Sequence, residues 1–277
     1  MNDYGRSDGS SPWDGVWVLI PAYQEARTIR SLASMALCYC PRVVVVDDGS
    51  TDGTSTMLED LPVLVLRHEA NCGKAASLRT GLAHALTQGA IAVVTLDGDG
   101  QHDPADLPLL LHAWRRHPSC IVLGSRLHDR AHFPPVRYRA NRIACFWISW
   151  AAGHAIADSQ TGFRVYPREV IAIALGPRVR CEGFAFESEI LIEAAREHRQ
   201  TVAVAIAGCY PAQARPSHFR PVMDISKIIL MVGGRLLRRG LALRELWRSL
   251  GRAPVLPARE CIVVDDQDAP LSGRSGR

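Results

Sequence analysis

The chain has 277 residues, of which 47% are hydrophobic and 22% are charged, and its formal net charge is +4 at pH 7. This composition can form a substantial core and excludes a chain that is disordered throughout. The positive charge is mild, and six arginines cluster between Arg235 and Arg252. Such a local excess favours an anionic surface over a nucleic-acid groove as the partner, so we expect no nucleic-acid ligand.

Cysteine usage and the first residues indicate where the protein works. The eight cysteines are scattered without a CxxC pair, which is typical of reduced thiols and not of a disulfide framework. The opening sequence MNDYGRSDGSSPWDG is polar and lacks the basic and apolar parts of a secretory signal. The apolar run near the C-terminus is far shorter than the roughly 20 residues of a spanning helix. We therefore expect a cytoplasmic protein without a transmembrane segment.

Short apolar runs rich in Val and Ile alternate with segments of helical periodicity. Strands are predicted at residues 16–20, 43–46, 63–66, 91–96, 120–124 and 202–206. Helices are predicted at residues 26–39, 55–61, 74–87 and 187–198. The first four strands are apolar throughout, which is typical of strands buried on both faces. The alternation predicts an α/β fold with a mainly parallel, Rossmann-like sheet that binds ligands at the carboxyl ends of its strands.

Three polar motifs follow predicted strands, at the edge of the sheet where this rule places a ligand. They are IPAYQE (Ile20 to Glu25), VDDGSTDGT (Val46 to Thr54) and LDGDGQHDP (Leu96 to Pro104). The third motif crowds three aspartates beside a buried strand, which is costly without a compensating cation. Asp, Gly and Ser are also common in turns and helix caps, but three such motifs at one edge favour a ligand site with a divalent metal.

The ordered set of motifs resembles the inverting family 2 glycosyltransferases of GT-A fold, and among them the polyprenol- and dolichyl-phosphate mannosyltransferases. The resemblance covers residues 16–220 and also includes NCGKAASLRTGL, GSR and DSQTGFR. It implies metal-dependent transfer of a sugar from a nucleotide-sugar, a UDP- or GDP-hexose, to a lipid-linked, polyprenyl-phosphate-like acceptor. Two alternatives stay open: transfer to a small-molecule or polysaccharide hydroxyl, and a sugar-phosphate nucleotidyltransferase. The second would be expected to carry a GxGxR loop where IPAYQE stands.

The resemblance also implies which residues bind the donor and the metal. The metal would be Mg²⁺ or Mn²⁺, which prefer hard oxygen ligands, and its ligands would be Asp97, Asp99 and Gln101. The donor would contact Pro21, Tyr23, Glu25, Asp47, Asp48, Asp97, Gly98, Asp99, Arg126, Arg215 and Arg220. Gly98 stands where the polyprenol branch usually has alanine.

Catalytic roles are implied for Glu187, Asp158 and Arg126. Arg126 would grip phosphate oxygens, and the two acids are candidate general bases. A phosphate acceptor is already anionic and needs no base, so the use of a base stays open. Asp158 is equally consistent with a structural role in its loop. Glu189 is a further candidate base, and the alternative for it is a solvated carboxylate on a helix face. Lys74 is expected to be an ordinary residue at a helix start, because the phosphate-loop pattern is absent around it.

The predicted domains are a disordered segment at 1–14, a GT-A domain at 15–222, an amphipathic basic helical extension at 223–251 and a disordered tail at 252–277. The extension carries apolar residues on one face and arginines elsewhere. Residues 225–250 either lie on a membrane surface, which would make the protein peripheral on the inner face of the cell membrane, or pack on the domain. His102 and Asp103 are expected either to serve the site or to form a turn before Pro104.

Overall fold

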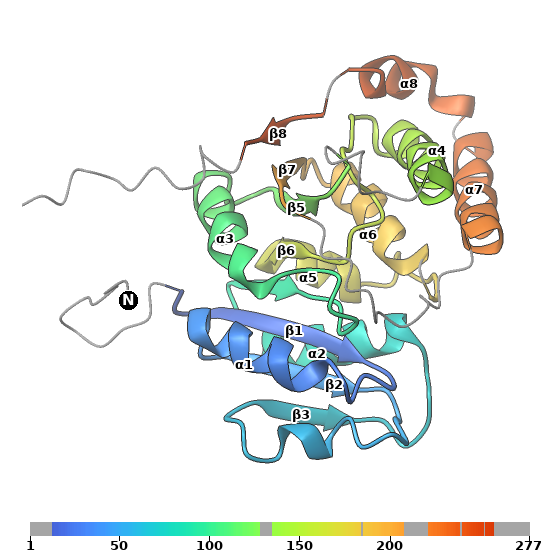
Figure 1. The fold of residues 1–277 in the computed structure, drawn as a ribbon. Helices are drawn as coiled ribbons and strands as arrows, with labels where there is room; N and C mark the ends of the chain where they lie inside the picture. The colour runs from blue at the N-terminus through green and yellow to red at the C-terminus, as the bar shows by residue number, and fades with distance from the viewer. Residues whose placement is uncertain are drawn as a thin grey trace, which may run out of the picture.

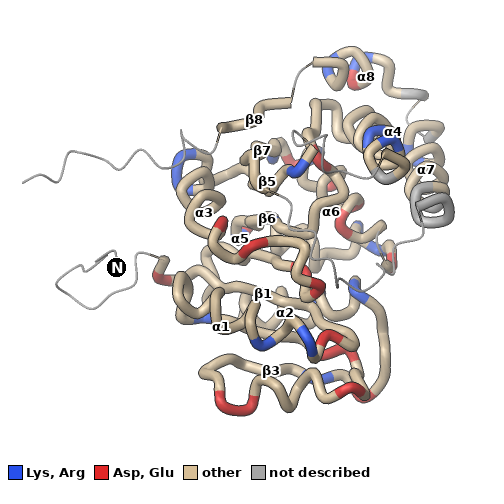
Figure 2. The backbone as a smooth tube through the Cα atoms, viewed as in Figure 1, with Lys and Arg blue, Asp and Glu red and all other residues tan. Residues whose placement is uncertain are grey.

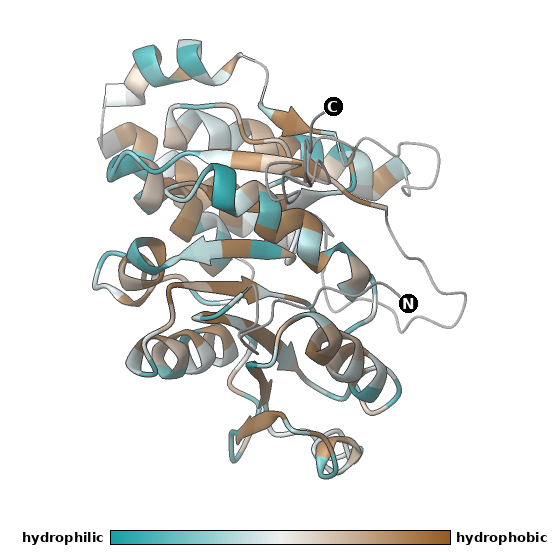
Figure 3. Cartoon of the chain, turned by 90° about the vertical axis from the view of Figure 1, so that its left-hand side faces the viewer, coloured by the Kyte–Doolittle hydropathy of each residue, from teal (hydrophilic) through white to brown (hydrophobic). Residues whose placement is uncertain are grey.

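A computed structural model of the chain describes residues 13–127, 135–183, 185–207, 221–238, 240–251 and 253–257. One sheet runs through the molecule, and helices cover both of its faces (Figure 1). Hydrophobic residues follow the strands and the helix faces turned toward them (Figure 3). This three-layer arrangement is the one expected when continuous apolar strands must be covered on both sides.

The sheet has eight strands in the order β3-β2-β1-β4-β6-β5-β7-β8. All neighbouring pairs are parallel except those of β6, which is antiparallel to both β4 and β5. The prediction of a mainly parallel sheet is confirmed. The strands are β1 (Val16–Ala22), β2 (Val43–Asp47), β3 (Leu64–Arg67), β4 (Ala92–Thr95), β5 (Ile121–Ser125), β6 (Arg164–Pro167), β7 (Thr201–Ala205) and β8 (Val255–Leu256).

Alternate residues along each central strand enter two separate hydrophobic clusters. In β1, Leu19 packs with the helices of one face, whereas Val18 and Ile20 pack with those of the other. The first face is covered by α2 (Lys74–Thr87), α4 (Pro135–Ala152), α5 (Arg168–Leu175), α6 (Ala185–Arg196) and α7 (Pro221–Arg238). The second is covered by α1 (Ile29–Tyr39) and α3 (Leu107–Arg116). The shorter elements are the 3-10 helices η1 (Thr56–Leu58), η2 (Pro104–Asp106) and η3 (Gly240–Ala242), and the helix α8 (Leu243–Ser249).

Four expectations differ from the structure. The helix predicted at residues 55–61 is the single 3-10 turn η1, and the strand predicted at 63–66 is the edge strand β3, which is partly exposed. The N-terminal segment was expected to be disordered through residue 14, but Trp13 is buried and packs edge-on against His112. The tail was expected to be disordered from residue 252, but β8 pairs with β7 and forms one edge of the sheet. Trp13 and β8 are held by residues that are distant in sequence, which a local pattern does not show.

The predicted C-terminal helix is divided into two helices. Helix α7 buries Ile228, Val232 and Leu236 in the same hydrophobic cluster as α2, α4 and α6, so packing on the domain is confirmed for this face. Trp247 and Leu250 were expected on the same apolar face of one continuous helix. The chain changes direction at Gly240, however, so that Trp247 in α8 and Leu250 just after it are exposed. None of the helices in the described ranges is long and apolar enough to span a bilayer.

We predict that Leu236 and its neighbour Leu237 contribute very differently to stability. Leu236 is 2% exposed and Leu237 is 70% exposed. Leu236→Ala leaves a cavity in the core and is expected to lower the free energy of unfolding by about 2–5 kcal/mol, whereas Leu237→Ala should change it by less than about 0.5 kcal/mol. Denaturant titration of both variants measures the difference, and equal stability would contradict the packing of α7.

Candidate active site

The acidic motif after β4 lies at the carboxyl end of the sheet, beside the loop that follows β1. Figure 2 shows Asp and Glu positions gathered at the end of the sheet where β1 and β2 finish. A Cβ on Gly98 would stand 3.0 Å from the carbonyl oxygen of Pro21, so the two loops touch through backbone. Pro21 itself is buried at the end of β1. The alanine that is usual at this place in the polyprenol branch would therefore be tight here, and the loops would have to separate slightly.

Asp97 is held against the start of β6. A Cβ on Gly162 would fall 2.1 Å from Asp97 Oδ2, so any side chain there would displace the carboxylate. Thr95 donates a hydrogen bond from its hydroxyl to the Gly162 carbonyl at 2.8 Å, which fixes the two segments together. The QTGFR motif therefore requires glycine at position 162, because a larger residue would collide with the Asp97 carboxylate.

Lys74, expected to be an ordinary helix-start residue, is part of this site, and that expectation is wrong. Its Nζ lies 2.7 Å from Asp97 Oδ1 and 2.9 Å from Glu187 Oε2. Burial opposes the charge of Lys74, but Asp97 and Glu187 together raise its pKa above the ordinary lysine value. Burial likewise opposes the charge of Asp97, yet Lys74, with a smaller contribution from Arg126, lowers the pKa of that carboxyl. The lysine is therefore the internal counter-ion of the acidic motif.

Within the described part of the chain, Asp99 forms no direct ion pair, and it is held by Gln101. The Gln101 side-chain amide donates to Asp99 Oδ2 at 2.7 Å, and the Gln101 backbone N–H donates to Oδ1 at 3.1 Å. The side-chain oxygen of Gln101, Oε1, accepts a hydrogen bond from Arg126 Nη1 at 3.2 Å. Burial and the neighbouring charge of Asp97 raise the pKa of Asp99 above its ordinary value. The three predicted metal ligands and Arg126 are thus brought together in one cluster.

This cluster fits a hard divalent cation. Asp97, Asp99 and Gln101 supply oxygen atoms, which are the ligands that Mg²⁺ and Mn²⁺ prefer. The raised pKa of Asp99 reports a negative charge that the protein does not fully compensate, and a divalent cation would stabilise it. These three residues would hold the metal.

Two aspartates at the carboxyl end of β2, both predicted to contact the donor, are held by hydrogen bonds within the protein. Asp47 accepts hydrogen bonds from the Ser50 backbone N–H at 2.9 Å and from the Ser55 hydroxyl. Asp48 accepts from the backbone N–H groups of Cys72 and Gly73 at 2.9 and 2.7 Å, and its Oδ1 lies 2.7 Å from His68 Nδ1. Asp48 therefore anchors the segment that starts α2 and places Lys74 in the site.

The IPAYQE loop is tied to the loop after β2 by several hydrogen bonds. The Gln24 and Glu25 backbone N–H groups donate to the hydroxyls of Ser50 and Thr54, each at 2.9 Å. Gln24 adopts a positive φ of 59°, a conformation that is unusual for a residue with a side chain and is held here by these contacts. Tyr23 and Glu25 of this loop are half-buried.

The two predicted acids of the catalytic set occupy different places. Glu187 faces Lys74 across the site and also lies 3.9 Å from Arg164 Nε. Asp158 is fully buried and accepts hydrogen bonds from the Asn141 side chain, the Gln160 backbone and the Arg126 backbone at 3.0, 3.2 and 3.4 Å. These contacts suit the structural role weighed for Asp158, since one of them holds the backbone of Arg126.

The end of the acidic motif combines a turn with a buried ring. Asp103 accepts a hydrogen bond from the Ala105 backbone N–H at 2.9 Å and so caps η2, which is the expected turn. His102 is buried, and its ring packs against that of Phe163 at a centroid distance of 5.4 Å. Burial, reinforced by the charge of Arg126, lowers the pKa of His102 to about 3, so its imidazole is neutral at ordinary pH. Arg215 and Arg220 lie outside the described residues.

A doubly wound sheet with buried acids and cations at the carboxyl ends of its strands defines an α/β protein of the nucleotide-binding class. The sequence profile described as glycosyl transferase family 2 matches residues 17–172, more than half of the chain. The chain belongs to this family and is a glycosyltransferase, which confirms the resemblance drawn from its motifs.

Individual relatives agree with this membership. The chain is 26% identical to the UDP-N-acetylglucosamine--dolichyl-phosphate N-acetylglucosaminyltransferase of Methanococcus voltae over 70% of its own length and 86% of that protein. It is 28% identical to the polyprenol monophosphomannose synthase of Mycolicibacterium smegmatis over 70% of its own length and 77% of that protein.

A solved structure shows the same fold. The glucosyl-3-phosphoglycerate synthase of Mycobacterium tuberculosis, in complex with Mn²⁺, UDP and phosphoglyceric acid, superposes with a TM-score of 0.59 at 21% identity, covering 81% of this chain and 78% of that one. The GT-A fold expected from the sequence is therefore confirmed.

We predict that the missing side chain of Gly162 is necessary for metal binding. Gly162→Ala is expected to push Asp97 aside and to weaken Mn²⁺ binding in the presence of UDP or GDP by about 10–100-fold, as for other residues that orient metal ligands. Gly233→Ala in α7 is the control, because a Cβ there meets nothing within 4 Å. Calorimetric titration compares the variants, and wild-type affinity in Gly162→Ala would contradict the role assigned to this contact.

Proposed function

We propose that the protein transfers a sugar, with inversion at the anomeric carbon, from a nucleotide-sugar to a polyprenyl-phosphate-like acceptor, with Mg²⁺ or Mn²⁺ as cofactor. The observation that carries the proposal is the cluster of Asp97, Asp99 and Gln101 between two cations, Lys74 and Arg126. A nucleoside diphosphate is the ligand that such an arrangement suits, since its phosphate oxygens can meet a metal and two cationic side chains.

The residues of the chain divide the work of the reaction. An acceptor oxygen attacks the anomeric carbon from the face opposite the nucleoside diphosphate, and the bond from that carbon to the diphosphate breaks. The bound metal would draw charge from the departing diphosphate. Arg126 and Lys74 offer further positive charge where negative charge develops, and Glu187 holds Lys74 in place. An acceptor phosphate brings its own anionic oxygen, so this route needs no general base.

The choice of a lipid acceptor is supported by the relatives and by one surface of the molecule. The printed names of two relatives describe transfer to dolichyl phosphate and synthesis of polyprenol monophosphomannose. Helix α4 contributes Asn141 to the site, and on its outer face it exposes Val136, Ile143 and Phe146. An exposed apolar surface on a helix that also contacts the site residue Asp158 suits an acceptor with a hydrocarbon chain.

Transfer to a hydroxyl is the second candidate, and a specific observation favours it. The structurally similar synthase was solved with phosphoglyceric acid, a small hydroxy acid. A hydroxyl acceptor would need a base, and Glu187 is the carboxylate of the predicted catalytic set that lies beside Lys74 and the acidic motif. The sugar-phosphate nucleotidyltransferase alternative does not agree with membership of the glycosyltransferase family.

We predict that the protein releases a nucleoside diphosphate in a reaction that needs the metal, the donor and a polyprenyl phosphate together. A screen of UDP- and GDP-hexoses with Mn²⁺ or Mg²⁺, with and without polyprenyl phosphate, identifies donor and acceptor by the mass of the product. Asp99→Asn should abolish turnover because the metal loses a charged ligand, whereas Asp103→Asn should retain it because asparagine also caps a helix. Product formed on a hydroxyl acceptor and not on the lipid phosphate would favour the second candidate.

We further predict that the C-terminal helices contact an anionic membrane. Leu230, Leu237, Leu243, Trp247 and Leu250 expose their side chains, with Trp247 at 81%, and arginines lie among them. The double variant Leu237→Glu/Trp247→Glu should reduce sedimentation with phosphatidylglycerol-containing vesicles at least about tenfold, because two apolar anchors are lost. Met57→Glu, at an exposed site on η1, should leave sedimentation unchanged. Equal sedimentation of both variants and the wild type would exclude these helices as the contact.

A further inference from the structure

Helix α6 carries three acidic residues that are almost fully buried. Glu187, Glu189 and Glu193 are 5%, 2% and 1% exposed. A carboxylate buried without a partner is strongly destabilising, so each of them requires cations or hydrogen-bond donors from its surroundings. Glu187 obtains them in the active site, from Lys74 and Arg164. Glu189, expected as a base or a solvated carboxylate, has neither environment and points away from the site.

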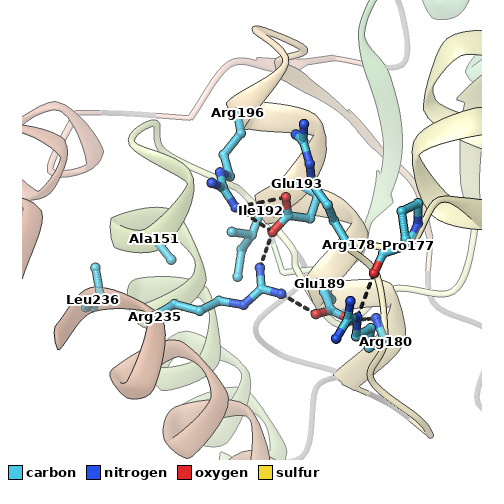
Figure 4. A pocket seen from close by; sticks show the side chains of 10 residues that line it. All are labelled: Ala151, Pro177, Arg178, Arg180, Glu189, Ile192, Glu193, Arg196, Arg235 and Leu236. Carbon is cyan, nitrogen blue, oxygen red and sulfur yellow. Dashed lines mark hydrogen bonds and ion pairs between the residues drawn. The ribbon is translucent and has the colours of Figure 1, made fainter. Parts of the chain in front are cut away.

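Arg235 of α7 satisfies both of the remaining carboxylates. One terminal nitrogen of its guanidinium pairs with Glu189 and the other with Glu193, and Figure 4 shows the side chain reaching between them. Glu193 also pairs with Arg196 of its own helix at 3.1 Å. Across the described ranges, Arg235 is the one cation from outside α6 that pairs with either carboxylate. We call this arrangement of Arg235, Glu189 and Glu193 the α6–α7 clasp.

The clasp extends to the segment that leads into α6. Glu189 uses its other oxygen, Oε2, to accept the backbone N–H groups of Arg180 and Cys181, each at 2.6 Å. Arg235 therefore holds Glu189, and Glu189 holds the backbone of Arg180 and Cys181, a few residues before α6 begins. The first turn of α6 presents Glu187 to Lys74, which is paired in turn with Asp97.

We propose that Arg235 is a positioning residue, which fixes the first turn of α6 and so sets the place of the Glu187–Lys74–Asp97 ion pairs from outside the active site. Its effect on the reaction rests on the function proposed above, whereas its effect on the structure does not. The clasp makes the geometry of the metal motif depend on the docking of α7, the helix that also exposes Leu230 and Leu237 on its outer surface.

The test compares Arg235→Gln, Arg235→Lys and the control Arg178→Gln. Arg178 and Arg235 line one pocket of about 520 Å³ between α6 and α7, but the ion pair of Arg178 with Glu197 is exposed. Arg235→Gln should speed hydrogen–deuterium exchange at the Arg180 and Cys181 amides, and should weaken Mn²⁺-dependent binding of UDP or GDP by about 10–100-fold, because a small displacement is enough to disturb such a site. Arg235→Lys keeps the charge and should restore part of both properties. Arg178→Gln should match the wild type.

A purely structural role is tested by Arg235→Gln/Glu193→Gln. This double variant also removes the charge of Glu193, for which Arg196 is the remaining cation in Arg235→Gln, and should recover part of the thermal stability. Glu189 still lacks its cation, so exchange and nucleotide binding should stay impaired. Full recovery of all three properties would overturn the proposal, as would wild-type exchange in Arg235→Gln. The exchange measurement needs no substrate, so a wild-type protein without transferase activity would contradict the proposed function and leave the clasp to be decided by exchange alone.

Discussion

The candidate active site depends on the partly buried ion pairs that Lys74 makes with Asp97 and Glu187. Three segments that are far apart in the chain meet there: the start of α2, the end of β4 and the first turn of α6. A charge withdrawn from water is tolerated when opposite charges and hydrogen bonds surround it, and each member of this cluster meets that need for the others. The positions of the proposed metal ligands therefore follow from the balance of charge within the site.

The neighbouring contacts hold this cluster in place. Asp48 binds the backbone just before Lys74, Gly162 leaves room for the Asp97 carboxylate, and Asp158 fixes the backbone of Arg126. None of these residues needs to touch a substrate to be necessary, since a site of this kind works only when its ligands are held within a fraction of an ångström. Asp48 and Asp158, which the sequence offers as donor-binding and catalytic candidates, thus hold the backbone beside Lys74 and at Arg126.

The C-terminal helices join this site to the outer surface of the molecule. One face of α7 completes the hydrophobic cluster around α4 and α6, and Arg235 on the same helix pairs with two carboxylates of α6. Leu230 and Leu237 of α7 and Leu243 and Trp247 of α8 are exposed, and the exposed Arg244 and Arg248 lie among them. Packing on the domain and contact with a surface are compatible, because a helix has two faces and can serve both.

The fold class, the family and the acidic motif can be read from the sequence, because continuous apolar strands, their alternation with helices and the order of the motifs are local properties of the chain. The antiparallel β6, the contacts of Lys74, Asp158 and Glu189, and the pairing of β8 with β7 follow only from the tertiary structure. Each of these depends on which charge or backbone group lies opposite a residue, and that partner is distant in sequence. A lysine at a helix start and a glutamate on a helix face look ordinary until the fold brings their counter-ions to them.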